Sequence, residues 1–164
     1  MIETLGSLGS FIGGFGVIIS VVYLAIQIRQ NTKSLSSAAY QQIVTSISDW
    51  SRAVAMDPEA VRIVSSGIND DGLLTPAELA QFDLLMVSLL RNYENVHFQY
   101  LSGALPESSW HGWSSRILGT LNNPGSLSWW RRQQGAYSPS FQQFVDLGIG
   151  QHTETAIPLW TGNA

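Results

Sequence analysis

The N-terminal part of the chain is an uninterrupted apolar run. From Leu5 to Ile26, 22 residues carry no charged side chain, and Arg29 and Lys33 follow the run. A helix rises about 1.5 Å per residue, so the run covers roughly 33 Å, enough to cross a hydrocarbon core about 30 Å thick. The run therefore predicts one transmembrane helix, with residues 1–33 as a membrane anchor.

A cleaved signal peptide is the alternative for the same run. The segment before it carries Glu3 and no Lys or Arg, and the run is longer than the usual apolar region of a signal peptide. A retained span is therefore favoured. Arg29 and Lys33 lie on the C-terminal side of the run, so the positive-inside rule predicts that the rest of the chain is cytoplasmic.

Small residues recur along the predicted anchor. They are spaced by three or four positions: Gly6, Gly9, Gly13, Gly16 and Ser20. On a helix this spacing places them on one face, where a second helix approaches closely in a bilayer. We expect this face to be a helix-packing interface. The alternative is that glycine is simply frequent in membrane helices.

Composition excludes several classes of function. The chain has 8 Lys and Arg residues against 12 Asp and Glu residues, so it has no basic field for nucleic acid. It has no cysteine, which excludes disulfides, thiolate nucleophiles and cysteine-ligated metal centres. No P-loop, dinucleotide-binding fingerprint or Gly-x-Ser-x-Gly elbow occurs. We expect neither an enzyme nor a bound cofactor.

Two regular apolar stripes predict long helices beyond the anchor. The first continues the anchor helix: Tyr40, Ile43, Ile47, Trp50 and Val54. The second follows a heptad pattern: Leu79, Phe82, Met86, Leu89, Tyr93, Val96 and Tyr100. Both have the spacing that buries one face of a helix. We expect the second stripe to mark the central core helix.

Proline and glycine divide the remaining chain into shorter helices. Asp57 and Pro58 predict the start of a helix that ends at Gly67. Thr75 and Glu78 form a capping box at the start of the core helix.

The sequence beyond the anchor predicts one small helical domain. No segment outside the anchor alternates like a β-strand, and roughly 130 residues suit a single domain. The fold class is therefore all-α, with a transmembrane helix that continues into a small bundle or hairpin with short trailing helices. This helical soluble domain covers residues 34–147, and an irregular tail covers residues 148–164.

The loop at 67–78 follows part of an EF-hand register. Asn69, Asp71 and Glu78 take the third, fifth and twelfth positions, but Gly67 stands where the first acid belongs. Glu78 is also fully explained by the capping box. We therefore assign no metal site, with calcium binding as the minor alternative.

A polar cluster on the core helix is a second candidate for chemistry. Glu94 and His97 share a helix face, so they could form an acid–base pair or hold a metal. A di-iron bundle needs further Glu ligands and a second Glu-x-x-His, which the chain lacks. We favour an ion pair between Arg91 and Glu94 that fixes helix register, and we assign no catalytic residue.

Tryptophan is concentrated in the C-terminal half. Because adjacent residues point about 100° apart on a helix, Trp129 and Trp130 rarely both fit into one small core. Core packing and a partner surface are equally favoured for this pair. Trp160 lies in the irregular tail, and such a tail orders by docking on something, so it is a third candidate for the partner surface.

Several short motifs together suggest a family. They are IQIRQNT at 26–32, LTPAE at 74–78, RNYEN at 91–95, WHGW at 110–113, PG at 124–125 and FQQFV at 141–145. With these motifs the chain resembles a family of small, uncharacterised bacterial single-span membrane proteins with a helical soluble domain. The resemblance covers residues from about 4 to 147. It implies location in the bacterial inner (cytoplasmic) membrane and brings no activity and no binding site.

These features predict a non-catalytic accessory or structural subunit of a larger bacterial membrane complex. Its expected partners are the membrane and other membrane-protein subunits. An energy-transducing complex, respiratory or photosynthetic, is the specific version, because the apolar run of the anchor has no charged residue for transport. One alternative is a self-associating scaffold, a homo-oligomer in which the glycine face and the stripe at 40–54 pair as a coiled coil. Another is a ligand-sensing or metal-sensing anchored domain.

Overall fold

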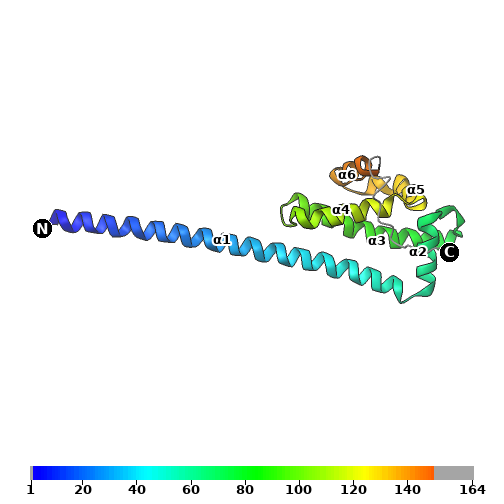
Figure 1. Cartoon of the computed structure of the whole chain (residues 1–164), viewed down its shortest axis with the longest axis horizontal. Helices are drawn as coiled ribbons and strands as arrows, with labels where there is room; N and C mark the ends of the chain where they lie inside the picture. Colours follow the sequence, from blue (N-terminus) through cyan, green and yellow to red (C-terminus); the bar gives the residue numbers. More distant parts are fainter. Residues whose placement is uncertain (1, 150–164) are drawn as a thin grey trace. The chain divides into compact units, whose positions relative to one another are not determined.

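The protein is built of helices connected by short turns (Figure 1). The computed structural model describes the backbone of residues 2–149 and the side chains of residues 16–149. The helices of this part are α1 (Ile2–Ala55), α2 (Pro58–Asn69), η1 (Asp71–Leu73), α3 (Pro76–Leu101), α4 (Glu107–Leu121), α5 (Pro124–Gln133), η2 (Gln134–Ala136) and α6 (Pro139–Ile149). No strand occurs within these described residues. The prediction of an all-α fold is confirmed.

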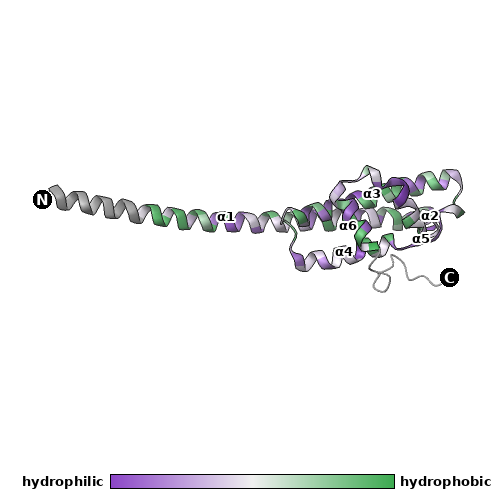
Figure 2. Ribbon diagram, turned by 90° about the horizontal axis from the view of Figure 1, so that it is seen from above, coloured by the Kyte–Doolittle hydropathy of each residue, from purple (hydrophilic) through white to green (hydrophobic). Residues whose placement is uncertain are grey.

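The chain divides into two compact units, Met1–Ala38 and Ala39–Ala164. The first unit is the N-terminal part of α1, where an apolar band precedes a polar stretch (Figure 2). Among the described residues, no helix combines the length and the apolar character needed to cross a membrane. The run predicted to span, residues 5–26, includes side chains 5–15, which lie outside the described residues.

Helix α3 is central to the core of the second unit. It packs against α2, α4 and α6. Its heptad positions are at most 1 % exposed at Phe82, Met86, Leu89, Tyr93 and Val96, which confirms the predicted core helix. Leu79 and Tyr100, near the ends of the stripe, are only half-buried.

The stripe on the C-terminal part of α1 also faces this core. Ile43, Trp50 and Val54 are buried, and Trp50 Nε1 donates a hydrogen bond to the carbonyl of Leu85 at 3.0 Å. These three side chains therefore pack within their own chain, whereas Tyr40, at the start of the stripe, is 44 % exposed. The coiled-coil version of the self-associating scaffold stays a prediction, with fewer apolar positions of residues 40–54 open to a second copy.

The helix starts follow the predicted capping chemistry. The Asp57 side chain accepts a hydrogen bond from the N–H of Glu59 at 3.0 Å, with Pro58 in the first turn of α2. Thr75 and Glu78 bond reciprocally: the Thr75 N–H donates to Glu78 Oε2 at 2.8 Å, and the Glu78 N–H donates to Thr75 Oγ1 at 3.4 Å. These bonds satisfy N–H groups that a helix start leaves without partners. The predicted capping box is confirmed.

Gly67 does not end its helix. Helix α2 continues to Asn69, and Gly67 is buried within it. A Cβ atom at Gly67 would lie 2.6 Å from the Phe82 ring, and one at Gly125 would lie 1.9 Å from the Gly67 carbonyl oxygen. The predicted helix end is wrong, because this glycine allows α2 to approach α3 and α5 closely instead of reversing the chain.

Candidate functional site

The longest run of exposed apolar side chains in the described chain is on α1. Large apolar side chains there are 50–64 % exposed: Val17, Ile18, Ile19, Val21, Val22, Tyr23, Leu24, Ile26 and Ile28. Because successive residues of a helix turn by about 100°, these positions surround the helix. A helix that is apolar on all sides belongs in lipid or inside a larger protein assembly. This band is the candidate attachment site.

The predicted small-residue face is described at Gly16 and Ser20. A Cβ atom at Gly16 would meet nothing within 4 Å. The Ser20 hydroxyl donates to the Gly16 carbonyl at 2.8 Å, so its polar atom already has a partner within the helix. Together with Val17, Val21 and Leu24 these residues line a shallow hollow. A neighbouring helix could therefore pack here without leaving a hydroxyl unsatisfied.

The other three members of the small-residue face are Gly6, Gly9 and Gly13. Their side-chain positions lie outside the described residues. The predicted helix-packing interface thus stays a prediction for them.

The apolar band gives way to polar side chains within about two turns. Gln27 Nε2 donates to the Tyr23 hydroxyl at 2.9 Å, and the Thr32 hydroxyl donates to the Ile28 carbonyl at 2.9 Å. Arg29 and Lys33 belong to the same two turns. Tyrosine and basic residues in this order are typical of the boundary between hydrocarbon and water.

The polar cluster on α3 is a structural brace. Arg91 Nη1 donates to Glu94 Oε2 at 2.7 Å, which confirms the predicted ion pair. The other Glu94 oxygen accepts the N–H of Ser138 at 2.7 Å, and Arg91 Nη2 donates to the Ala136 carbonyl at 2.9 Å. These bonds fasten η2 and the start of α6 to α3. Burial raises the pKa of Glu94, but the Ser138 and Arg91 hydrogen bonds outweigh it and hold the pKa below its ordinary value.

His97 belongs to the aromatic packing of the same region. Its side chain is 5 % exposed, and its ring centroid lies 5.1 Å from that of Phe144 and 5.6 Å from those of Trp110 and Phe141. Burial lowers its pKa, with Glu94 opposing. Both Glu94 oxygens have other partners, so the pair is not set up as an acid–base couple.

The acidic loop before α3 is also used structurally. Asn69 Nδ2 donates to the Ser65 carbonyl at 2.8 Å, Asp71 forms an ion pair with Arg132 at 2.7 Å, and Glu78 pairs with Arg62. These partners engage all three EF-hand positions. Within the part of the chain that the structure describes, no three His, Asp or Glu side chains gather as metal ligands.

Trp129 and Trp130 both lie in the core, with exposed fractions of 0 % and 1 %. The Trp130 ring packs 5.3 Å from Tyr137 and 5.8 Å from Phe141, and its Nε1 donates to Asp146 at 3.2 Å. Helix α5 contacts α2, α4, η1 and η2, so more than one of its faces is covered. The alternative that placed this pair on a partner surface is therefore wrong.

Trp160 lies outside the described residues. Its predicted place on a partner surface stays a prediction.

The apolar stripes did not identify Phe98 and Leu101. Both occupy the last turn of α3 and are 63 % and 58 % exposed. Their position outside the heptad stripe of α3 is only a weak signal of exposure, because Leu90 also falls outside the stripe and is buried.

Comparison of the chain with protein-family models, with curated protein sequences and with solved structures gives no match. The function is therefore argued from geometry and chemistry.

Proposed function

We propose that this protein is a non-catalytic accessory subunit of a larger bacterial membrane complex, held in the inner membrane by residues 1–33. The observation that carries the proposal is the band of exposed apolar side chains around α1, from Val17 to Ile28. All residues of this band belong to the first unit, so its apolar character comes from the sequence of α1 alone.

The size of the apolar band supports attachment rather than solvent exposure. Full burial of one such side chain gains about 1.5–3 kcal/mol, so nine of them favour a nonaqueous surrounding by on the order of 10 kcal/mol. This is as large as the whole stability of many small domains. The charge-free residues 5–15 extend the same run.

The absence of catalysis is supported by how the acidic candidates are used. Glu78 caps α3 and pairs with Arg62, and Glu94 braces α6 against α3. These bonds position the helices relative to one another. An attached domain of this kind contributes surface and position to an assembly.

Membrane attachment is tested by adding charge within the band. The double variant Val17→Lys, Val21→Lys places two lysines in the run, and each costs about 2.5–3.5 kcal/mol near the centre of a membrane helix. The control Ser34→Lys, Leu35→Lys adds the same charge at exposed positions beyond the band. The wild type and the control should stay in the membrane pellet after carbonate extraction, and the band variant should be released. Equal retention of all three proteins would refute the anchor.

Association with other subunits is tested at the small-residue face. Gly16→Leu fills the hollow beside Ser20, whereas Val22→Leu enlarges a side chain of the band that does not line this hollow. Close helix packing in a bilayer depends on small residues, so purification in mild detergent should retain unrelated subunits at fixed stoichiometry with Val22→Leu and lose them with Gly16→Leu. A uniform homo-oligomer without other subunits would contradict the accessory role and favour a scaffold.

A further inference from the structure

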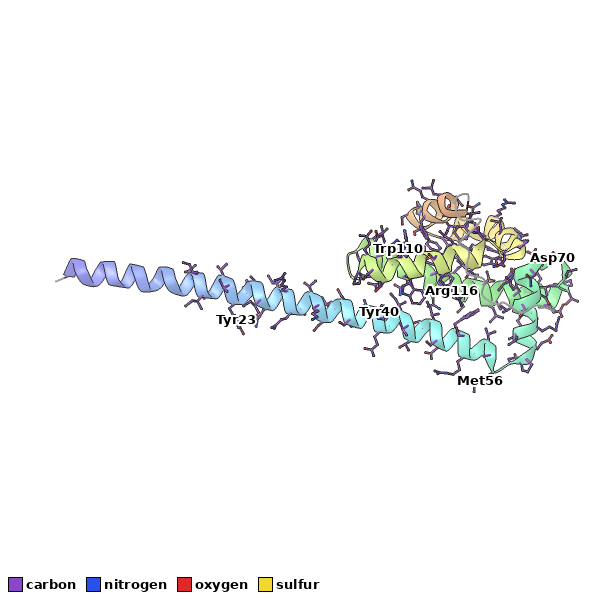
Figure 3. All side chains as sticks on the ribbon, in the orientation of Figure 1. Tyr23, Tyr40, Met56, Asp70, Trp110 and Arg116 are labelled. Atoms are coloured by element: carbon purple, nitrogen blue, oxygen red, sulfur yellow. The ribbon has the colours of Figure 1, made fainter. Side chains whose placement is uncertain are left out.

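One end of the second unit gathers aromatic and apolar side chains. It consists of residues 39–44 of α1, the last turn of α3, the 102–106 loop and the first two turns of α4, and we call it the aromatic end. Ile43 packs with Val96 and Leu105, and the Tyr100 ring stacks on Trp110 at 4.5 Å. These contacts join α1, α3 and α4 at this end of the unit (Figures 1 and 3).

The outer side chains of the aromatic end are apolar or amphipathic. Phe98 is 63 % exposed, Leu101 is 58 % exposed and Tyr40 is 44 % exposed. Trp110 and Trp113 are half-buried beside them, and Tyr40 and Trp113 line a shallow hollow of about 430 Å³. Tyrosine and tryptophan of this kind favour the interface between acyl chains and headgroups.

Charge is almost absent from the segments that build this end. Apart from histidine, residues 34–48 and 95–115 contain one charged side chain, Glu107, and Arg116 is the charged residue that lines the hollow beside Tyr40 and Trp113. The opposite end of the unit, around α2 and η1, is rich in charge: Glu59, Arg62, Asp70, Asp71, Glu78 and Arg132. Single exposed apolar residues are normal on a protein surface, but the fold does not explain why they coincide with an aromatic end that is poor in charge.

The chain reaches this end directly from the proposed anchor. Tyr40 follows Lys33 by seven residues. Seven residues span at most about 25 Å in any conformation, since an extended chain covers no more than about 3.6 Å per residue. The aromatic end is therefore tethered close to the membrane boundary that Arg29 and Lys33 mark.

We propose that the aromatic end rests on the lipid bilayer, with Phe98 and Leu101 at the boundary of headgroups and acyl chains. The inference rests on the proposed anchor and adds the orientation of the domain: the aromatic end, which is poor in charge, toward the lipid, and the charged end toward the aqueous phase. Apolar side chains that enter this boundary gain transfer free energy in proportion to the apolar area that they remove from water. A second, shallow attachment thus complements the helix.

The absence of cysteine allows a direct test with single reporters. Ser102→Cys labels the aromatic end without removing an apolar residue, Met56→Cys labels a 79 % exposed position at the other end of α1's core stripe, and Val22→Cys labels the band. Each full-length variant carries a fluorophore and is reconstituted into phosphatidylcholine vesicles that contain lipids with nitroxide at the headgroup or at a shallow acyl position. We expect quenching at 22 and 102, and none at 56.

Substitutions then assign the effect to the apolar side chains. Phe98→Ser, Leu101→Ser should abolish quenching at 102 and leave quenching at 22 unchanged. The matched pair Leu73→Ser, Leu84→Ser removes two side chains that are 75 % and 73 % exposed elsewhere on the unit and should leave quenching at 102 intact. Circular dichroism of both double variants checks that the helices persist.

Three results separate the inference from the proposed function. Quenching at 22 but not at 102 overturns the inference and leaves the anchor in place. Protection of the label at 102 in native membranes, without quenching in vesicles, also overturns it and assigns the surface to a protein partner. Absence of quenching at 22 overturns the anchor itself.

Discussion

Glu94 shows how one carboxylate joins distant segments of the chain. Its two oxygens bind Arg91 on the same helix and the N–H of Ser138, 44 residues away. The Arg91 guanidinium also lies 4.6 Å from the centre of the Tyr137 ring. One side chain thereby fixes both the register of α3 and the starting point of α6.

Replacing Glu94 should destabilise the domain. Glu94→Ala removes the acceptor of Arg91 Nη1 and of the Ser138 N–H. We expect a loss of about 1–2 kcal/mol in the free energy of unfolding, measured by urea titration. Asp49→Ala is the matched control, because its ion pair with Arg52 has the same spacing but is exposed on both sides. Exposed pairs contribute about 0–1 kcal/mol, so this control should change little. Equal losses would show that Glu94 is not a brace.

Glu78 should make stability depend on pH in acid. The Thr75 hydrogen bonds and Arg62 lower its pKa from 4.5 to about 2 in the folded chain. Because the folded pKa lies below the unfolded one, its contribution is complete above pH 4.5 and is lost as pH falls towards 2. Glu78→Gln keeps an acceptor for Thr75 but does not titrate, so unfolding free energy measured across this window should fall less steeply. Glu107→Gln, on exposed α4 surface, should keep the wild-type slope.

At the scale of single helices, the sequence predicts features that depend on neighbouring residues better than features that depend on contacts between helices. The capping box at Thr75 was predictable because its partner Glu78 lies three residues away, and the stripe of α3 because its periodicity is visible in the sequence of the helix alone. The role of Gly67 was not, because the Phe82 ring and Gly125 that approach it come from other helices. The sequence also left the burial of Trp129 and Trp130 undecided, because several other helices cover α5 and these contacts depend on the tertiary fold.

The close crossing of α2 and α5 gives a test at this scale. In Gly125→Ala the new methyl group would meet the backbone of Gly67, Ile68 and Asp71, which cannot rotate away. Such overpacking costs about 1–3 kcal/mol or more, and we expect the larger figure as a lowered urea midpoint. Gly112→Ala, within α4 and with nothing within 4 Å, should be neutral or stabilise by about 1 kcal/mol. Similar effects of both substitutions would mean that α2 and α5 do not meet at Gly125.

At the scale of the whole molecule, stability and attachment are assigned to different parts of the chain. Every buried residue in the described part lies from Ile43 to Val145, so the core draws on the second unit alone. The first unit contributes exposed apolar side chains that no residue of that core requires. A substitution in the first unit should therefore leave the stability of the core unchanged, and a substitution in the core should leave attachment unchanged.

Removal of residues 1–33 tests this division. The shortened chain still contains all of the buried residues, so its helical circular dichroism and its urea midpoint should match those of the full chain in the same detergent, because distant sites contribute independently. Its attachment should no longer resist carbonate, since the aromatic end alone buries few side chains in lipid. An unfolded fragment would show that the second unit needs residues 1–33 to fold. A folded fragment that still resists carbonate extraction would show that the helical domain, and not α1, anchors the protein.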